Sequence, residues 1–232
     1  PFPDRNKTQK YRNSYNYIYH NKCALLKTSF GCQYRCEFCY CIEITQHHYF
    51  ERDLSEVIAE LKLIREKNIF IVDDNFLFNK TRVLEFCKLL EENGIQKNFI
   101  LFGRADFIAG NEDVIKCFRA TGLQAVFVGI ESFREEELIS MNKKTSVEMN
   151  VKAVKVLEKH DVECYSGIIV GMDWEEQDFK NLATWLNQFK QPAVNIQPIT
   201  PMPGTPLFRK MKSKLRIPRG RYEYWDMAHL VF

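Results

Sequence analysis

The chain has 232 residues, of which 45% are hydrophobic, enough to bury the core of one domain with small appendages at most. Its formal net charge is only +3, from 33 basic and 30 acidic residues that are interspersed, so neither a nucleic-acid-binding nor a membrane-surface protein is indicated. No apolar run approaches the roughly 18 residues of a membrane span, and eight cysteines are too few for a disulfide scaffold.

From residue 24 onward, short apolar runs alternate with longer amphipathic segments. The apolar runs predict strands at residues 24–29, 69–72, 99–102, 125–128, 163–170 and 193–198. The amphipathic segments predict helices at residues 53–67, 79–92, 112–120, 135–140, 146–159 and 174–189. Such alternation is typical of a parallel sheet, because parallel neighbours need crossover connections. Six units fit into this span, so we expect an α/β fold, an open six-stranded (β/α)6 partial TIM barrel with outer helices.

Two segments fall outside this pattern. Residues 1–23 are polar, rich in Asn and Tyr, and without a sustained period, which predicts an N-terminal linker to a core at residues 24–208. The chain starts with neither Met nor the apolar segment of a signal peptide, so we expect an internal junction there. Residues 209–232 are basic and then aromatic, which indicates a C-terminal extension that covers the open barrel edge or begins a further segment.

A cysteine-rich loop follows the first predicted strand. Cys32, Cys36 and Cys39 form a C-x3-C-x2-C pattern, and sulfur ligands at this spacing select zinc, copper(I) or an iron–sulfur cluster. A closed zinc site would need a second ligand pair, which is not recognisable, and a disulfide would leave one thiol over. Three ligands suit a cubane of four irons in which one iron stays open to a non-protein ligand. Cys41 could add a fourth ligand.

Charged side chains follow the second and third predicted strands, where ligand-binding groups lie in a parallel barrel. Asp73 and Asp74 could bind an ammonium group through charge-assisted hydrogen bonds, or cap the next helix. Arg104 could form a bidentate pair with a ligand carboxylate, or simply pair with Asp106 or Glu131.

The later strands end in different chemistry. The fourth ends in Glu131 and Ser132, and Ser132 could equally be the N-cap of the next helix. The fifth carries Gly167 and Gly171, which would let a nucleobase lie against the backbone, although strand glycines often mark only a bulge. The sixth runs into a rigid turn, Pro201-Met202-Pro203-Gly204-Thr205-Pro206-Leu207.

In chain order, these elements resemble the motifs of the radical S-adenosylmethionine (radical SAM) enzymes, and the resemblance covers residues 24–208. It implies a [4Fe–4S] cluster on Cys32, Cys36 and Cys39 without Cys41, with Phe38 as the aromatic residue before the last cysteine. It also implies a binding site for S-adenosylmethionine. The expected contacts are Asp73 and Asp74 to the amino group, Arg104 to the carboxylate, Glu131 and Ser132 to the ribose and methionine part, and Ile169 and Gly171 to adenine.

Three pieces are similar to the cobalamin-binding radical SAM subgroup: Pro1-Phe2-Pro3-Asp4-Arg5, Val72-Asp73-Asp74-Asn75-Phe76 and Trp225-Asp226-Met227-Ala228-His229. The resemblance implies reductive cleavage of S-adenosylmethionine to a 5′-deoxyadenosyl radical, for cobalamin-dependent methylation of an unactivated carbon. Cobalamin-independent rearrangement or oxidation is the alternative. Any cobalamin domain would lie outside this chain.

The resemblance further implies a small-molecule or natural-product substrate and an electron donor such as flavodoxin or ferredoxin. Unpaired cysteines and an oxygen-sensitive cluster favour a reducing, cytoplasmic setting. Two rival classes make different demands on the chain. An iron–sulfur electron-transfer protein would need a fourth cluster ligand, and a zinc-ribbon module would need a second ligand pair.

Overall fold

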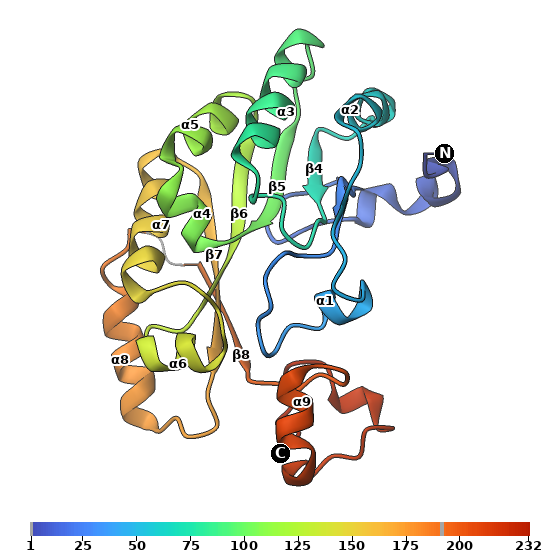
Figure 1. The fold of residues 1–232 in the computed structure, drawn as a ribbon. Coiled ribbons are helices and arrows are strands. Elements are labelled where there is room, and N and C mark those ends of the chain that lie inside the picture. Colours follow the sequence, from blue (N-terminus) through green and yellow to red (C-terminus); the bar gives the residue numbers. More distant parts are fainter. Residues whose placement is uncertain (1, 191–192) are drawn as a thin grey trace.

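A six-stranded parallel sheet forms the centre of the computed structural model, which describes residues 2–190 and 193–232 (Figure 1). Within this sheet, each strand pairs in parallel with the sheet strand that follows it along the chain. The predicted open, six-stranded partial barrel is therefore confirmed. In sheet order the strands are β1 (Cys23–Leu26), β4 (Asn68–Ile71), β5 (Asn98–Gly103), β6 (Leu123–Glu131), β7 (Glu163–Val170) and β8 (Ala193–Pro198).

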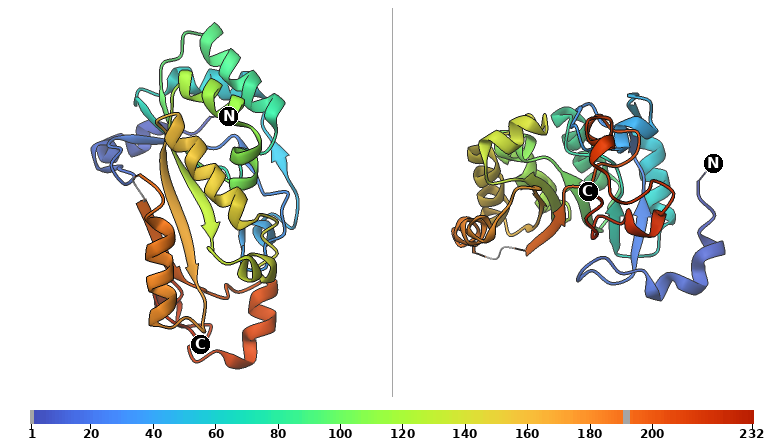
Figure 2. Two further views of the ribbon diagram at one scale, coloured as in Figure 1. Left: turned by 90° about the vertical axis from the view of Figure 1, so that its left-hand side faces the viewer. Right: turned by 90° about the horizontal axis from the view of Figure 1, so that it is seen from below.

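Helices cover the outer face of this sheet, as the side view in Figure 2 shows. Their ends agree with local capping: Asp53 accepts a hydrogen bond from Ser55 N at the start of α2, and Asn79 accepts one from Arg82 N at the start of α3. Two short helices follow β5 and β6 directly. The helices are α2 (Leu54–Leu63), α3 (Lys80–Glu92), α4 (Ala105–Gly110), α5 (Glu112–Ala120), α6 (Glu135–Ser140), α7 (Val147–Lys159) and α8 (Glu176–Leu186).

The sheet separates two apolar layers, because successive side chains of a strand point to opposite faces. On the outer face, Phe99 packs against Phe86 and Phe118 of the helices, with ring centroids 5.5 and 5.6 Å away. On the inner face, Phe102 lies 5.3 Å from Phe70 and 5.5 Å from Phe127 between ring centroids. This inner aromatic layer fills the barrel below the carboxyl ends of its strands.

The structure differs from the sequence prediction at the start of the core. β1 stops at Leu26, and a separate strand β2 (Ser29–Phe30) pairs antiparallel with β3 (Phe50–Glu51). The break falls at the polar residues Lys27 and Thr28, which the predicted strand at residues 24–29 includes. β2 and β3 close the base of the cysteine loop.

The first residues also form more structure than their composition predicts. A 3-10 helix, η1 (Arg5–Ser14), has Asp4 as its N-cap. Two ion pairs fix it to the core: Arg5 with the buried Glu60 at 2.6 Å, and Arg12 with Glu66 at 2.8 Å. Contacts from distant residues, not an apolar period, hold this segment.

The C-terminal segment lies at the carboxyl end of the sheet, below β8 in Figure 1. It contains α9 (Pro206–Met211) and two 3-10 turns, η2 (Lys212–Lys214) and η3 (Tyr222–Tyr224). Phe208, Trp225 and Val231 form a small apolar cluster of their own. This segment therefore packs beside the barrel end that carries the cysteine loop and its short helix α1 (Cys41–Ile44).

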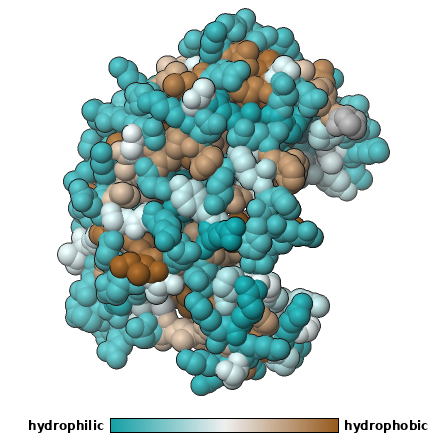
Figure 3. All heavy atoms as spheres, in the orientation of Figure 1, coloured by the Kyte–Doolittle hydropathy of each residue, from teal (hydrophilic) through white to brown (hydrophobic). Residues whose placement is uncertain are grey.

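The surface in the orientation of Figure 1 is mainly hydrophilic, with hydrophobic side chains in separate patches (Figure 3). Among residues 2–190 and 193–232, no helix is both long enough and apolar enough to span a membrane.

Candidate active site

The cysteine loop begins at Gly31, whose backbone conformation only glycine adopts easily. Its φ is +82°, and a Cβ at this position would lie 2.1 Å from the carbonyl oxygen of His48. The Gly31 amide donates a 2.9 Å hydrogen bond to Asp74 Oδ2. Asp74 is partly exposed and also lies 3.5 Å from Lys27 Nζ. The carboxyl end of β4 thus fixes the start of the loop.

Asp73 is held by hydrogen-bond donors within the protein. It is fully buried, and its oxygens accept hydrogen bonds from Thr28 N at 2.6 Å, Thr28 Oγ1 at 2.5 Å and Ser29 Oγ at 2.7 Å. Burial raises the pKa of Asp73, and these donors lower it in part. Both oxygens are used to join β4 to the residues before the loop. A contact from Asp73 to an amino group would have to share an oxygen that already accepts a hydrogen bond within the protein.

The far side of the cysteine loop contacts two other segments. Glu37 N donates to Met141 O at 3.0 Å, and Asn142 Nδ2 donates to Arg35 O at 2.7 Å. Glu37 also pairs with Lys210 of α9 at 2.9 Å. The loop is thus held between the turn after α6 and the C-terminal segment.

In the described part of the chain, all eight cysteines are free thiols. Cys36 is 7% exposed, and burial raises the pKa of Cys32 and Cys36. A hydrogen bond from Cys41 lowers the pKa of Cys39 to about 7, and the same bond raises the pKa of Cys41.

These cysteines provide suitable ligands but not a preformed metal site. Among the residues described, no three His, Cys, Asp or Glu side chains are gathered as a metal ion requires. The donor set nevertheless fits an iron–sulfur cluster, because three free thiols share one loop and two cations, Arg104 and Lys143, act on Cys36. Buried Gln33 Nε2 and Asn75 Oδ1 also lack hydrogen-bond partners in this region.

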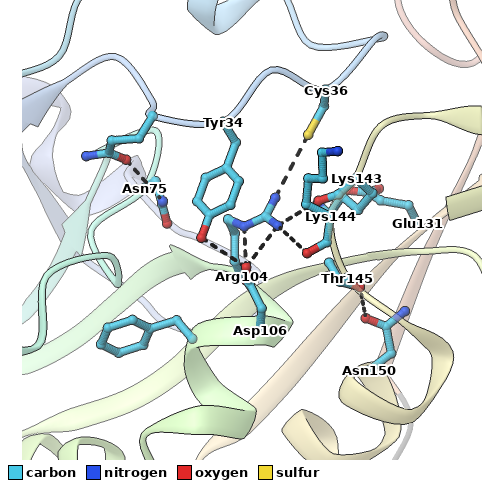
Figure 4. Close-up of polar contacts among 12 residues, drawn as sticks. Tyr34, Cys36, Asn75, Arg104, Asp106, Glu131, Lys143, Lys144, Thr145 and Asn150 are labelled. Atoms are coloured by element: carbon cyan, nitrogen blue, oxygen red, sulfur yellow. Dashed lines mark hydrogen bonds and ion pairs between the residues drawn. The ribbon is translucent and has the colours of Figure 1, made fainter. Parts of the chain in front are cut away.

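Arg104 lies directly beside this loop (Figure 4). Its guanidinium donates to both carboxylate oxygens of Asp106, at 3.0 and 3.1 Å, and to Lys143 O at 2.6 Å. It lies over the Tyr34 ring, 3.4 Å from the centroid, and its Nη1 is 3.9 Å from Cys36 Sγ. Of the two alternatives for Arg104, the structure shows pairing with Asp106. Its donors are directed at protein groups rather than at open space for a carboxylate.

Glu131 lies at an irregular end of β6. The register with β7 shifts between Gly129 and Glu131, and Glu131 has a left-handed φ of +62°. This turn brings Glu131 Oε1 to 2.6 Å from Lys143 Nζ, and both residues are largely buried. Ser132 is fully buried, contacts Glu137 Oε2 and accepts a 3.0 Å hydrogen bond from Arg134 N. Arg134, not Ser132, is the N-cap of α6.

A cavity of about 170 Å³ opens beside the loop at the carboxyl ends of β6, β7 and β8. Phe38, Ile169 and Glu131 all contribute to its wall, so these three residues from different segments share one cavity. Gly171 lies outside the lining, because its backbone is packed against Trp174 and Asp173. The lining residues are Phe38, Cys39, Tyr40, Phe127, Glu131, Gly167, Ile168, Ile169, Asn195, Gln197, Pro198, Ile199, Thr200, Met202 and Met227.

Sequence reasoning missed several of these residues. Lys143 follows α6 in a run of polar residues and carries no motif, although it pairs with Glu131 across the site. Asn195 and Gln197 alternate along β8 and so share its inner face, a signal that was present in the strand pattern. Met227 belongs to the C-terminal extension, which the sequence predicts to lie at the open barrel edge or at the start of a further segment, without a ligand-binding role.

Comparison with known proteins identifies the family. The model of the radical SAM superfamily matches residues 26–186. The chain belongs to the radical SAM superfamily. It is 27% identical over 222 residues to the hopanoid C-3 methylase of Methylococcus capsulatus, which covers 96% of this chain and 42% of that protein. It is also 27% identical over 218 residues to the anaerobic magnesium-protoporphyrin IX monomethyl ester cyclase of Cereibacter sphaeroides, which covers 87% of this chain and 34% of that one.

Among solved structures, the radical SAM chain is similar to the cobalamin-dependent S-adenosylmethionine radical enzyme OxsB with aqua-cobalamin bound. The TM-score is 0.70 at 16% identity, covering 82% of this chain and 35% of that chain. The predicted membership of the superfamily, with cobalamin-dependent enzymes among the similar folds, is confirmed. The chain spans less than half the length of these curated relatives.

Proposed function

We propose that this chain is the catalytic core of a radical SAM enzyme. Cys32, Cys36 and Cys39 would hold a [4Fe–4S] cluster, and S-adenosylmethionine would bind in the adjoining cavity. One observation carries the proposal: Phe38 and Cys39 share a cavity wall with Glu131 and Ile169, which come from two different strand ends. Cluster binding would require the three cysteine side chains to turn toward a common point.

When bound, the cluster and S-adenosylmethionine supply one-electron cleavage of the sulfonium to methionine and a 5′-deoxyadenosyl radical. The residues of the chain bind and orient S-adenosylmethionine and exclude water from it. Of the two neighbouring carboxylates, Asp74 is partly exposed whereas Asp73 is buried, so we propose Asp74 as the ligand for the amino group of S-adenosylmethionine. Phe127, Ile168 and Met202 line the cavity with apolar surface, which keeps water from a reactive species.

The contacts divide the expected ligand residues into two groups. Glu131, Ile169 and Phe38 line the cavity and are proposed to contact S-adenosylmethionine. Asp73 and Ser132 are fully buried and bonded within the protein. We assign these two to supporting the site rather than to binding.

For the whole protein we propose methylation of an unactivated carbon in a small molecule or natural product, with cobalamin from a domain outside this chain. The similarity to hopanoid C-3 methylase and to OxsB supports this. The second candidate is cobalamin-independent rearrangement or oxidation. The equal identity to the magnesium-protoporphyrin IX monomethyl ester cyclase, which is named a cyclase and not a methylase, supports only a reaction other than methylation. An electron donor such as flavodoxin or ferredoxin and a cytoplasmic setting complete the proposal.

Cysteine variants test the cluster. After anaerobic reconstitution we expect about four irons per chain in the unmodified protein, near-complete loss in Cys39→Ala, and retention in Cys41→Ala. Cys87→Ala is the matched control, because Cys87 lies in the helical core of α3. Loss of iron in Cys41→Ala and not in Cys39→Ala would contradict the assignment of ligands.

Product analysis tests the chemistry. Fully loaded protein with dithionite and S-adenosylmethionine is expected to release 5′-deoxyadenosine, and its absence would contradict the proposed function. The full-length protein can then be given S-adenosylmethionine with a deuterated methyl group. Label in the substrate product supports methylation, whereas an altered product without label supports the second candidate.

A further inference from the structure

Arg104 connects the cysteine loop to the end of β5 through an unusually complete set of contacts. We call Tyr34, Arg104 and Asp106 the Arg104 clamp (Figure 4). Tyr34 comes from the cysteine loop, Arg104 from the N-cap of α4, and Asp106 from the first turn of that helix. The clamp therefore joins residues about 70 positions apart in the chain at one point beside Cys36.

The geometry leaves the guanidinium one orientation. Asp106 accepts from Nε and Nη2 at 3.0 and 3.1 Å, Lys143 O also accepts from Nη2 at 2.6 Å, and the Tyr34 ring covers one face of the guanidinium at 3.4 Å. The Tyr34 hydroxyl donates to Asp106 Oδ2 at 2.9 Å and so fixes the carboxylate as well. The nitrogen left over, Nη1, points at Cys36 Sγ, 3.9 Å away.

The electrostatic effect of this arrangement on Cys36 is weakly screened. The Arg104 side chain is 8% exposed and Cys36 is 7% exposed, so little water lies between them. Lys143 is a second buried cation that acts on Cys36, and it is paired with Glu131 at 2.6 Å. Each cation beside Cys36 thus has its own carboxylate, and removing either member of a pair changes the charge that the sulfur experiences.

We propose that Arg104 is a positioning residue for Cys36 and that the Arg104 clamp sets the reduction potential of the cluster bound there. This rests on the proposed function. On reduction the oxidised cluster takes one electron from the reductant and becomes more negative. An N–H donor and a positive charge at a ligand sulfur stabilise that product, whereas an unpaired carboxylate opposes it. Arg104 therefore raises the potential, and Asp106 moderates that effect.

The test measures the midpoint potential of the reconstituted protein by redox titration, without S-adenosylmethionine, together with iron and sulfide content. We expect Arg104→Met to lower the reduction equilibrium constant about tenfold, which is about 59 mV for one electron. Asp106→Asn is expected to raise the potential. The control is Arg134→Met, because Arg134 also pairs with a nearby carboxylate and lies over aromatic rings, but makes no contact with the loop among the interactions of the described residues.

Opposite shifts in Arg104→Met and Asp106→Asn, with no shift in Arg134→Met, support the inference, because loss of loop structure alone would not reverse sign. Unchanged potentials in fully loaded variants, or shifts of the same sign, overturn it. Should Arg104→Met retain no iron, the sign in Asp106→Asn decides. A loss of S-adenosylmethionine affinity without a shift in potential would also overturn it, and return Arg104 to the carboxylate role. If the unmodified protein holds no cluster, the proposed function fails, and this inference fails with it.

Discussion

Arg104 and Arg134 have the same local setting in two regions of the molecule, yet their surroundings differ. Each is the N-cap of a six-residue helix that directly follows a strand, and each has a carboxylate two or three residues later. Arg104 is 8% exposed and binds the cysteine loop and the turn at Lys143. Arg134 is 21% exposed and pairs with Glu137 and Asp178 near the rim. The sequence pattern around the two arginines is the same. Their roles therefore differ because Arg104 is more buried and contacts the cysteine loop and the Lys143 carbonyl.

The aromatic rings next to the two arginines also lie at different distances. The Arg104 guanidinium lies 3.4 Å from the Tyr34 centroid, whereas that of Arg134 lies 5.5 Å from Phe133 and 5.2 Å from Trp174. A desolvated cation over a ring is worth more than one in water. The Arg104 region should therefore contribute more to stability.

The largest expected difference is in the free energy of unfolding of the cluster-free protein. Arg104→Met should cost about 3 kcal/mol, because it leaves the Asp106 carboxylate and the Lys143 carbonyl without their donor in a mostly buried site. Arg134→Met should cost clearly less, since its partners reach water. Urea denaturation of both variants measures this. Equal losses would show that burial does not separate the two regions.

A smaller effect is expected for the hydroxyl of Tyr34. A double-mutant cycle of Tyr34→Phe and Asp106→Ala should give a coupling of about 1 kcal/mol, because Tyr34→Phe removes the donor and Asp106→Ala the acceptor of their 2.9 Å hydrogen bond. The matching cycle in the Arg134 region uses Trp174→Phe and Glu137→Ala, because Trp174 Nε1 donates a 2.8 Å hydrogen bond to Glu137 Oε1. The coupling energy of this second cycle should be smaller than that of the first. A larger value would contradict the expectation that the Arg104 region contributes more to stability.

The sequence predicted the fold well because the information needed was local. Each apolar run between amphipathic segments had to be a buried parallel strand, and crossover chirality left one arrangement of neighbours. What it missed depends on distant contacts. Ser29 and Phe30 leave the first strand because they pair with Phe50 and Glu51, and η1 is held by ion pairs to Glu60 and Glu66.

The candidate site follows the same division. The cysteine spacing and the polar residues at the strand ends are local signals, and Phe38, Glu131 and Ile169 do line one cavity. The partners of Arg104 could not be chosen from sequence. Asp106 is two residues away and was one alternative, but the stacking on Tyr34 joins positions 70 residues apart. Lys143 reaches Glu131 from a loop with no recognisable pattern.

The smallest expected effect concerns acid stability and belongs to the Arg134 region. A backbone hydrogen bond from Glu175 and the Arg134 guanidinium lower the pKa of Asp178 below its usual range. A carboxyl group with a lowered pKa stabilises the fold at neutral pH, and this contribution is lost as the pH falls from about 4 through the lowered value, because the unfolded chain binds the proton first. Asp178→Asn should therefore flatten the decline of stability below about pH 4, followed by urea midpoints across pH. Arg134→Met should flatten it partly, because the backbone hydrogen bond remains, and Arg104→Met should leave this part of the profile unchanged. If the stability of Asp178→Asn declines below about pH 4 as steeply as that of the unmodified protein, the Arg134 region does not take part in acid unfolding.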